Sequence, residues 1–178
     1  MSDEIDKVDG KTDWKYNEVG KFQEGAVYAG LKSYVVRAIV DGKRLLGTLI
    51  EGDTCAYLVE NHKIYKQYEY QVLIEGSCGD SSLEWRWATG KVLPDGAIIG
   101  GNDGAHMLFI GRAAFEGHIL VGSYRIDTGS LQVGYGENTH DFTECDVLCR
   151  IATFLTLFQL TLNFQERIMG AKQGVPVL

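Results

Sequence analysis

Proline and cysteine are scarce in this sequence of 178 residues, which contains two prolines and four cysteines. So few prolines exclude a proline-rich linker, and four cysteines are too few for a disulfide-rich scaffold. No Cys-x-x-Cys pair occurs, so we interpret the cysteines as reduced, mostly buried thiols and expect neither a metal site nor a cofactor. The N-terminal sequence MSDEIDKVDG lacks the apolar core of a secretory signal. We therefore expect a cytoplasmic protein, or one that is vesicle-associated or released without a signal peptide.

Basic residues are also in deficit, because 17 Lys and Arg face 24 Asp and Glu, giving a net charge of -7. Binding to a phosphate backbone requires a basic surface, so we expect no nucleic-acid partner. The hydrophobic fraction of 45% is enough for a packed interior and excludes wholesale disorder. Nucleophile-elbow, Walker, zinc-protease and dinucleotide-binding motifs are missing, so we expect no enzymatic activity.

An internal repeat organises the chain. Residues 34–47 align without gaps with residues 109–122, at an offset of 75 residues. The identical pairs are Arg37/Arg112, Ala38/Ala113, Gly42/Gly117, Leu45/Leu120 and Gly47/Gly122. Such self-similarity predicts two copies of one structural unit.

Upstream of this block the offset falls to 71 residues, which pairs Trp14 with Trp85. The change in offset predicts a four-residue insertion in the second copy, between Gly101 and Phe109. The predicted organisation is an acidic flexible N-terminus (1–13), repeat 1 (14–75), a linker (76–84), repeat 2 (85–149) and an apolar C-terminal tail (150–178).

Each copy reads as short strands joined by tight turns. Asp41-Gly42 and Glu116-Gly117 lie between apolar runs, as in the turn of a β-hairpin. Neither copy can bury a core alone. We therefore predict an all-β fold in which two tandem pseudo-symmetric repeats of short antiparallel strands pack as one compact unit.

The C-terminal tail has a different pattern. Residues 151–164 form a continuous apolar stretch that is shorter than the ~20 residues needed to cross a bilayer. We expect a helix or strand that packs on the β unit or on a partner. Association with a membrane or vesicle surface through 151–164 is the alternative.

Several sequence blocks of the second copy occur in a characteristic order. They are WATGKVLPDGAIIGGNDG (87–104), LFIGRA (108–113), GHILVG (117–122), YGENTH (135–140) and DVL (146–148). This order resembles the DM-nine repeat family, whose repeats occur in tandem pairs, and the resemblance extends over about 14–149. It implies a mannose-binding, lectin-like protein with a role in innate immunity, similar to an oyster lectin and to the N-terminal part of natterin-like proteins.

Two departures from the family pattern concern the expected site. The first copy shortens the Gly-x-Asp loop and lacks its acidic residue. Both copies lack the lysine that helps to hold sugar in lectin-like members, because Gly47 and Gly122 are followed by Thr48 and Ser123.

Sugar hydroxyls need carboxylate acceptors and amide or cationic donors, and the sequence supplies these on two loops of the second copy. The predicted carbohydrate-binding residues are Asn102, Asp103, Glu137, Asn138 and His140. A second, weaker site in the first copy would use Asp41, Lys43, Asn61 and His62. The alternatives are that Asn102-Asp103-Gly104 merely forms a turn and that the first-copy charges are solvated.

Two residue types have a structural interpretation. We expect Arg37 and Arg112 to point inward and each to pair with a carboxylate of the other copy. The tryptophans are expected to anchor the core; they are Trp14, Trp85 and Trp87.

These observations favour a non-enzymatic, mannose-type lectin that binds mannose-containing glycans and forms a homodimer, since lectins gain strength through multivalency. An intracellular or vesicle-associated interaction scaffold that has lost sugar binding is the second hypothesis. A glycan-active enzyme using Asp103 and Glu137 is the third.

Overall fold

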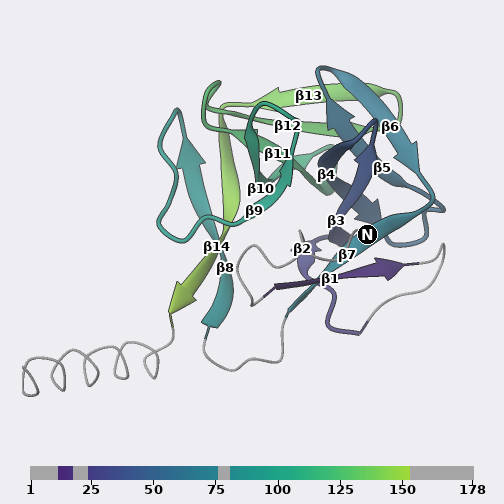
Figure 1. Ribbon diagram of the computed structural model, residues 1–178, viewed down its shortest axis with the longest axis horizontal. Coiled ribbons are helices and arrows are strands. Elements are labelled where there is room, and N and C mark those ends of the chain that lie inside the picture. Colours follow the sequence, from purple (N-terminus) through teal and green to yellow (C-terminus); the bar gives the residue numbers. More distant parts are fainter. Residues whose placement is uncertain (1–11, 18–23, 76–80, 153–178) are drawn as a thin grey trace, which may run out of the picture.

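The computed structural model describes residues 12–17, 24–75 and 81–152, and every regular element in these ranges is a β-strand (Figure 1). The strands of the first repeat are β1 (Thr12–Asn17), β2 (Tyr28–Gly30), β3 (Ser33–Val40), β4 (Lys43–Ile50), β5 (Ala56–Glu60), β6 (Lys63–Gln67) and β7 (Tyr70–Glu75). Those of the second repeat are β8 (Ser81–Thr89), β9 (Ile99–Asn102), β10 (Met107–Phe115), β11 (His118–Arg125), β12 (Ser130–Tyr135), β13 (Asn138–Phe142) and β14 (Glu144–Ala152). The prediction of an all-β fold is confirmed.

The two sets of strands pair in the same pattern. β7 lies between β1 and β3, as β14 lies between β8 and β10. The antiparallel pairs β3–β4, β4–β5 and β5–β6 recur as β10–β11, β11–β12 and β12–β13. The register also recurs, because Val36 faces Val72 and Gly111 faces Val147. The tandem pseudo-symmetric repeats predicted from the 75-residue offset are therefore confirmed.

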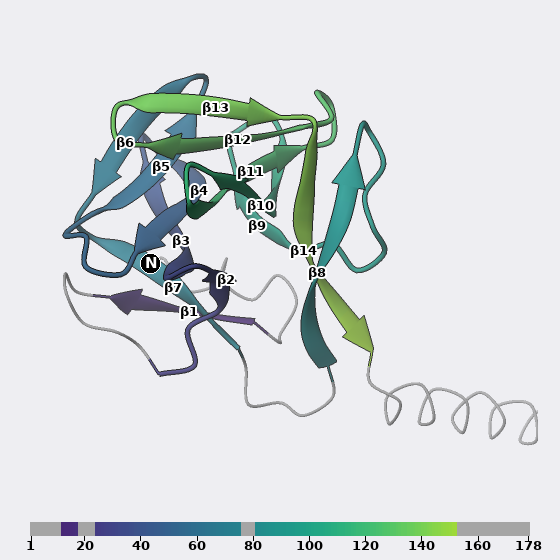
Figure 2. The same cartoon turned by 180° about the vertical axis from the view of Figure 1, so that it is seen from behind.

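The repeats share one core and one sheet. β4 of the first repeat pairs with β9 of the second, with Arg44 opposite Asn102. The largest cluster of buried side chains combines Leu46 of the first repeat with Ile110 and Val121 of the second. Figure 2 shows the hairpins β5–β6 and β12–β13 together at one end, with β1 and β7 at the other. Burial of apolar surface between the repeats thus makes them one compact unit.

The predicted hairpin turns are present. Asp41 and Gly42 have φ angles of 50° and 77°, and Glu116 and Gly117 have 47° and 79°. Two successive residues at positive φ are the signature of a type I′ turn, whose twist matches that of the flanking strands. Each Asp/Glu-Gly pair therefore fixes the register of its hairpin, β3–β4 or β10–β11.

Two equivalent glycines allow close approach of strands. A Cβ atom on Gly47 would lie 2.1 Å from the carbonyl oxygen of Tyr57, and one on Gly122 would lie 1.9 Å from that of Gln132. Tyr57 and Gln132 are themselves 75 residues apart. The repeat retains glycine here because a backbone carbonyl occupies the space of any side chain.

Arg37 and Arg112 cross the boundary between the repeats in a reciprocal manner. Nη1 of Arg37 donates to the carbonyl oxygen of Gly100 (3.4 Å), and Nη1 of Arg112 donates to that of Ala29 (2.6 Å). These carbonyls occupy equivalent positions, at the 71-residue offset. Each guanidinium also lies over a tryptophan of its own repeat, Trp14 or Trp85.

The expected pairing of Arg112 with a carboxylate of the other copy is wrong. Arg37 Nε donates to Gln71 Oε1 at 2.8 Å, and Arg112 donates to Asp146 Oδ2 at 3.0 and 3.1 Å. Both acceptors belong to the arginine's own repeat, because β7 and β14 lie directly beside β3 and β10.

The described strands extend past the expected boundaries. β8 begins at Ser81, inside the expected linker, and β14 ends at Ala152, inside the expected tail. The expected N-terminus (1–13) and the apolar stretch 151–164 fall mostly outside the described residues. No helix in the described part of the chain is long and apolar enough to cross a membrane.

Candidate functional site

The four-residue insertion forms the loop between β9 and β10. Here Asn102 Oδ1 accepts a hydrogen bond from the N–H of Gly104 (2.5 Å). Asp103 Oδ1 accepts from the N–H groups of Ala105 (2.9 Å) and His106 (2.7 Å). These side chains close the loop on itself, which is the turn chemistry expected of Asn and Asp.

The carboxylate of Asp103 is held inside this loop, with its side chain only 8% exposed. Its Oδ2 lies 3.3 Å from Arg125 Nη1 and 3.4 Å from His106 Nδ1. Burial raises the pKa of Asp103, but the two backbone N–H donors and the charge of Arg125 outweigh burial and lower it overall. The geometry assigns Asp103 to holding the loop and Arg125 in place, rather than to presenting both oxygens to a ligand.

Arg125 also binds the more exposed carboxylate of Asp127. The contacts are Nη2–Oδ2 at 2.8 Å and Nε–Oδ1 at 3.1 Å, a bidentate pair. This hydrogen bonding holds the pKa of Asp127 at about 2, although some desolvation opposes it. His106 Nε2 lies 3.7 Å from Asp127 Oδ2. Asp127 and His106 have side chains 38% and 41% exposed, so a ligand can reach both.

The first repeat contributes an ion pair to the same region. Lys43 Nζ lies 2.5 Å from Glu60 Oε1, and the Glu60 side chain is 11% exposed. The hydrogen bond to Glu60 raises the pKa of Lys43 against partial desolvation, and the negative charge of Asp103 adds to the increase. Glu60 in turn raises the pKa of Arg125, after the larger effect of Asp127. We call these residues the junction cluster: Lys43, Glu60, Asp103, His106, Arg125 and Asp127.

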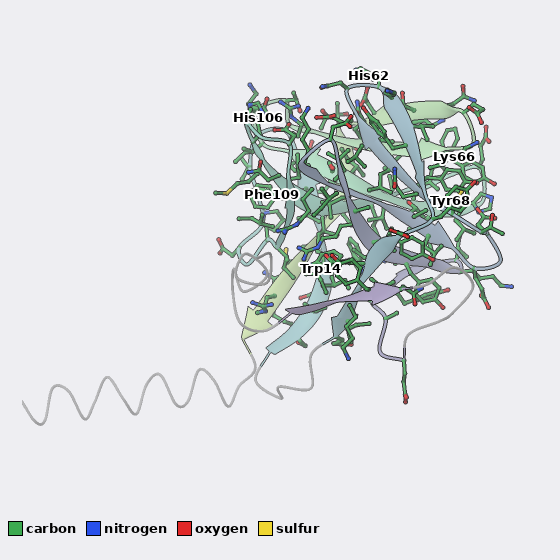
Figure 3. All side chains as sticks on the ribbon, turned by 45° about the vertical axis from the view of Figure 1, so that its right-hand side comes forward. Trp14, His62, Lys66, Tyr68, His106 and Phe109 are labelled. Carbon is green, nitrogen blue, oxygen red and sulfur yellow. The ribbon has the colours of Figure 1, made fainter. Side chains whose placement is uncertain are left out.

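The other predicted residues of the second copy lie elsewhere. Glu137 has a side chain 83% exposed and pairs with Lys66 Nζ at 2.5 Å. Asn138 is exposed, and His140 packs on the ring of Phe115 with 3.9 Å between centroids. Figure 3 shows Lys66 on the opposite side of the molecule from His106. The structure therefore separates these three residues from Asn102 and Asp103.

The four predicted residues of the first copy also lie in different parts of the structure. Asp41 and Asn61 are exposed residues of hairpin turns with positive φ. His62 Nδ1 lies 3.3 Å from Asp141 Oδ2, and the backbone N–H of His62 donates to Gln132 Oε1, so this residue ties its hairpin to the second repeat. Lys43 is the member that the structure brings to the junction cluster.

Sequence reasoning missed four members of the junction cluster. Arg125 and Asp127 border the turn between β11 and β12, Glu60 ends β5, and His106 closes the inserted loop. The usable signal was the insertion itself, because an extra loop on one copy marks a place where the two copies differ.

The three tryptophans do not share one role. Trp14 and Trp85 are partly buried and pack against the main core, as expected. Trp87 is 62% exposed, so its assignment to the core is wrong. It lies on the outer strand β8, opposite Asp146, where no further described strand covers it.

The cysteines that the structure describes lie in the protein interior. Cys55, Cys145 and Cys149 are buried and form no disulfide. Burial raises the pKa of the Cys145 thiol to about 12, which makes it a poor nucleophile. Within the described ranges, no three His, Cys, Asp or Glu side chains are grouped to hold a metal ion.

The DM9 repeat family model matches residues 28–107, from the start of β2 to the first residue of β10. No curated protein matches the chain significantly. Among solved structures, the nematode sperm cell motility protein MFP2B is similar, with a TM-score of 0.62 and 15% sequence identity. The match covers 80% of this chain but 47% of that protein, so the chain spans about half of its length. At this identity the likeness shows a shared fold alone, whereas the sequence match shows that residues 28–107 are similar to the DM9 repeat family.

Proposed function

We propose that this protein binds neutral, mannose-type glycans without catalysis, and that the junction cluster is the binding site. The observation that carries the proposal is that the ion pair Lys43–Glu60 of the first repeat lies near the Asp103–Arg125–Asp127 group of the second. β4 pairs with β9 there, and the charge of Asp103 acts on Lys43 while that of Glu60 acts on Arg125. A sugar hydroxyl both donates and accepts a hydrogen bond, so a pair of vicinal hydroxyls suits a surface of alternating cations and carboxylates.

The exposed atoms of the cluster define the roles of its members. Lys43 and Arg125 donate to sugar oxygens, and Asp127 accepts from hydroxyl groups. Their side chains are 35%, 24% and 38% exposed, so contact does not require the fold to open. Asp103 acts behind them by fixing the position of Arg125.

The decisive experiment compares two lysines of the same repeat. Lys43 and Lys66 each bind a glutamate at 2.5 Å, but only Lys43 belongs to the junction cluster. We expect the unmodified protein to be retained on mannose–agarose and eluted by methyl α-mannoside, Lys43→Met to lose retention, and Lys66→Met to keep it. Asp127→Asn should weaken retention as well.

Two results would reject the proposal: no retention of the unmodified protein on neutral sugars, or equal retention of the Lys43 and Lys66 variants. Circular dichroism of each variant checks that the sheet is intact. Sedimentation of the unmodified protein tests the proposed homodimer, which would present two or more clusters at once.

An interaction scaffold without sugar binding is the second candidate, and one observation favours it. Thr48 and Ser123 stand where lectin-like relatives have a sugar-holding lysine, and both are buried, at 0% and 4% exposure. Thr48 Oγ1 hydrogen bonds to Val121 of the other repeat. These positions serve packing between repeats, so sugar binding depends on the junction cluster; failure of the retention experiment would favour the scaffold.

A further inference from the structure

A hollow lies on the first repeat, and no member of the junction cluster lines it. It has a volume of about 220 Å³, and its wall is formed by β1, β3, β4 and β7. Pockets for drug-sized ligands hold about 300–1,000 Å³, so this groove accommodates a single small ring. Its principal side chains are Tyr16, Ile39, Arg44, Glu69 and Gln71.

The strand register places these side chains on one face of the sheet. Tyr16 of β1 lies directly opposite Gln71 of β7, and Ile39 of β3 lies opposite Arg44 of β4. Glu69 lies in the bend between β6 and β7, two residues before Gln71. The groove is therefore built on four neighbouring strands and on the bend that precedes β7.

The lining combines an apolar platform with balanced charge. Tyr16 is 75% exposed and Ile39 is 63% exposed, although both belong to strands of the sheet. Arg44 and Glu69 add one positive and one negative charge. An ionic ligand would leave one of these charges opposed, whereas a neutral ring with hydroxyl groups can donate to the carboxylate and accept from the guanidinium.

The second repeat offers an internal contrast. Trp87 occupies the position of Tyr16 and is also exposed, at 62%, so an outward aromatic recurs at this place in the repeat. One exposed aromatic needs no explanation, but two at equivalent positions do. The positions of Ile39 and Arg44 are occupied by Ala114 and Ile119, so the second repeat lacks the cationic donor.

We infer that the groove beside Tyr16 is a binding site for one neutral pyranose ring, with the ring face on Tyr16 and hydroxyl groups on Glu69 and Arg44. The ligand class rests on the proposed function, but the site is separate from the junction cluster.

The test is a titration of the full isotope-labelled chain with methyl α-mannoside, followed by backbone amide NMR shifts. Shifts at Ile39 and Gln71 report the groove, and shifts at His106 and Asp127 report the junction cluster. We expect Tyr16→Ala to weaken binding at the groove about tenfold and to leave the cluster unchanged. Glu69→Gln, an exposed and nearly isosteric change, should weaken the groove as well.

Trp87→Ala is the matched control, because it removes the equivalent exposed aromatic; groove binding should be unaffected. Groove shifts that persist unchanged in both Tyr16→Ala and Glu69→Gln would overturn the inference. So would an absence of groove shifts in the unmodified chain. Groove shifts without cluster shifts would reject the proposed function and uphold this site, and the reverse pattern would do the opposite.

Discussion

The two boundaries between the repeats use the same backbone but different side chains. At the junction cluster, Lys43 pairs with Glu60. The equivalent residues of the second repeat are His118 and Tyr135, whose Nε2 and OH lie 3.2 Å apart. One boundary therefore carries a lysine–glutamate ion pair where the other carries a histidine–tyrosine hydrogen bond.

The loops at these boundaries also differ between the repeats, both in length and in charge. β2 and β3 are joined by a two-residue turn, Leu31-Lys32, whose φ angles are 43° and 62°. β9 and β10 are joined by the longer loop that contains Asp103 and His106. The core and the turns preserve the repeat, whereas the insertion and a few charged residues specialise one boundary.

The glycines at the close approach should behave alike in both repeats and show the largest effect. Gly47→Ala and Gly122→Ala each place a methyl group against a carbonyl oxygen, so we expect a loss of about 3 kcal/mol in unfolding free energy. Gly42→Ala and Gly117→Ala meet open space and suffer only from positive φ, about 1 kcal/mol. Urea unfolding measures all four. A Gly122→Ala protein as stable as the unmodified one would show that Gly47 and Gly122 do not have equivalent roles in the two repeats.

The equivalent arginines should differ, because their surroundings differ. Arg37 is 4% exposed, and Arg37→Met leaves the buried amide of Gln71 and the carbonyl of Gly100 without this donor; we expect a loss of about 2–3 kcal/mol. Arg112→Met also leaves a carbonyl, that of Ala29, without this donor, but its carboxylate partner Asp146 is 37% exposed and regains water, so a smaller loss of about 1–2 kcal/mol is expected. Chemical denaturation compares the two. Equal losses of unfolding free energy in the two variants would mean that burial of the arginine does not determine the size of the loss.

Thr48 and Ser123 provide a smaller contrast. Thr48 Oγ1 accepts from the N–H of Val121 (2.5 Å) and donates to its carbonyl oxygen (2.9 Å). Ser123 Oγ is buried with no hydrogen-bond partner among the described residues. Thr48→Val should therefore cost about 1–2 kcal/mol, and Ser123→Ala should be neutral or slightly stabilising. Thermal unfolding of both variants decides; a costly Ser123→Ala would show that its hydroxyl does have a partner.

The repeat could be predicted because packing constrains residue identity at fixed spacing. Gly47 and Gly122 must both lack a side chain, and Asp41-Gly42 and Glu116-Gly117 must both adopt positive φ. Such requirements place the same residue types at equivalent positions of the two repeats, 75 residues apart. The all-β fold, the hairpins and the position of the insertion were accordingly readable from the sequence.

The site was less readable, since its residues meet only through tertiary structure. Lys43 and Asp103 were assigned to two different sites, yet β4 and β9 pair and bring them to one. Glu137 was predicted as a site residue because it lies in a family-like segment, but it pairs with Lys66 on another side of the fold. Nothing in the local sequence of Arg125 or Asp127 indicates that the inserted loop folds back onto them.

Acid should lower the stability contributed by the two boundaries unequally. This is the smallest of the effects predicted here. The pKa of Asp127 falls to about 2 because of its hydrogen bonds with Arg125, and that of Asp103 is also lowered overall. Groups with a depressed pKa stabilise the fold fully above their ordinary value of 3.8 and lose this contribution as the pH falls towards 2.

Melting temperatures measured between pH 5 and pH 2 should therefore decline less steeply in Asp127→Asn, which has no carboxylate to protonate, than in the unmodified protein. The effect is small, because Asp127 is 38% exposed and water screens its ion pair. At the other boundary the equivalents of Arg125 and Asp127 are Ile50 and Gly52, which do not titrate. A melting temperature of Asp127→Asn that declines as steeply as that of the unmodified protein would mean that this ion pair does not set the acid sensitivity of the boundary.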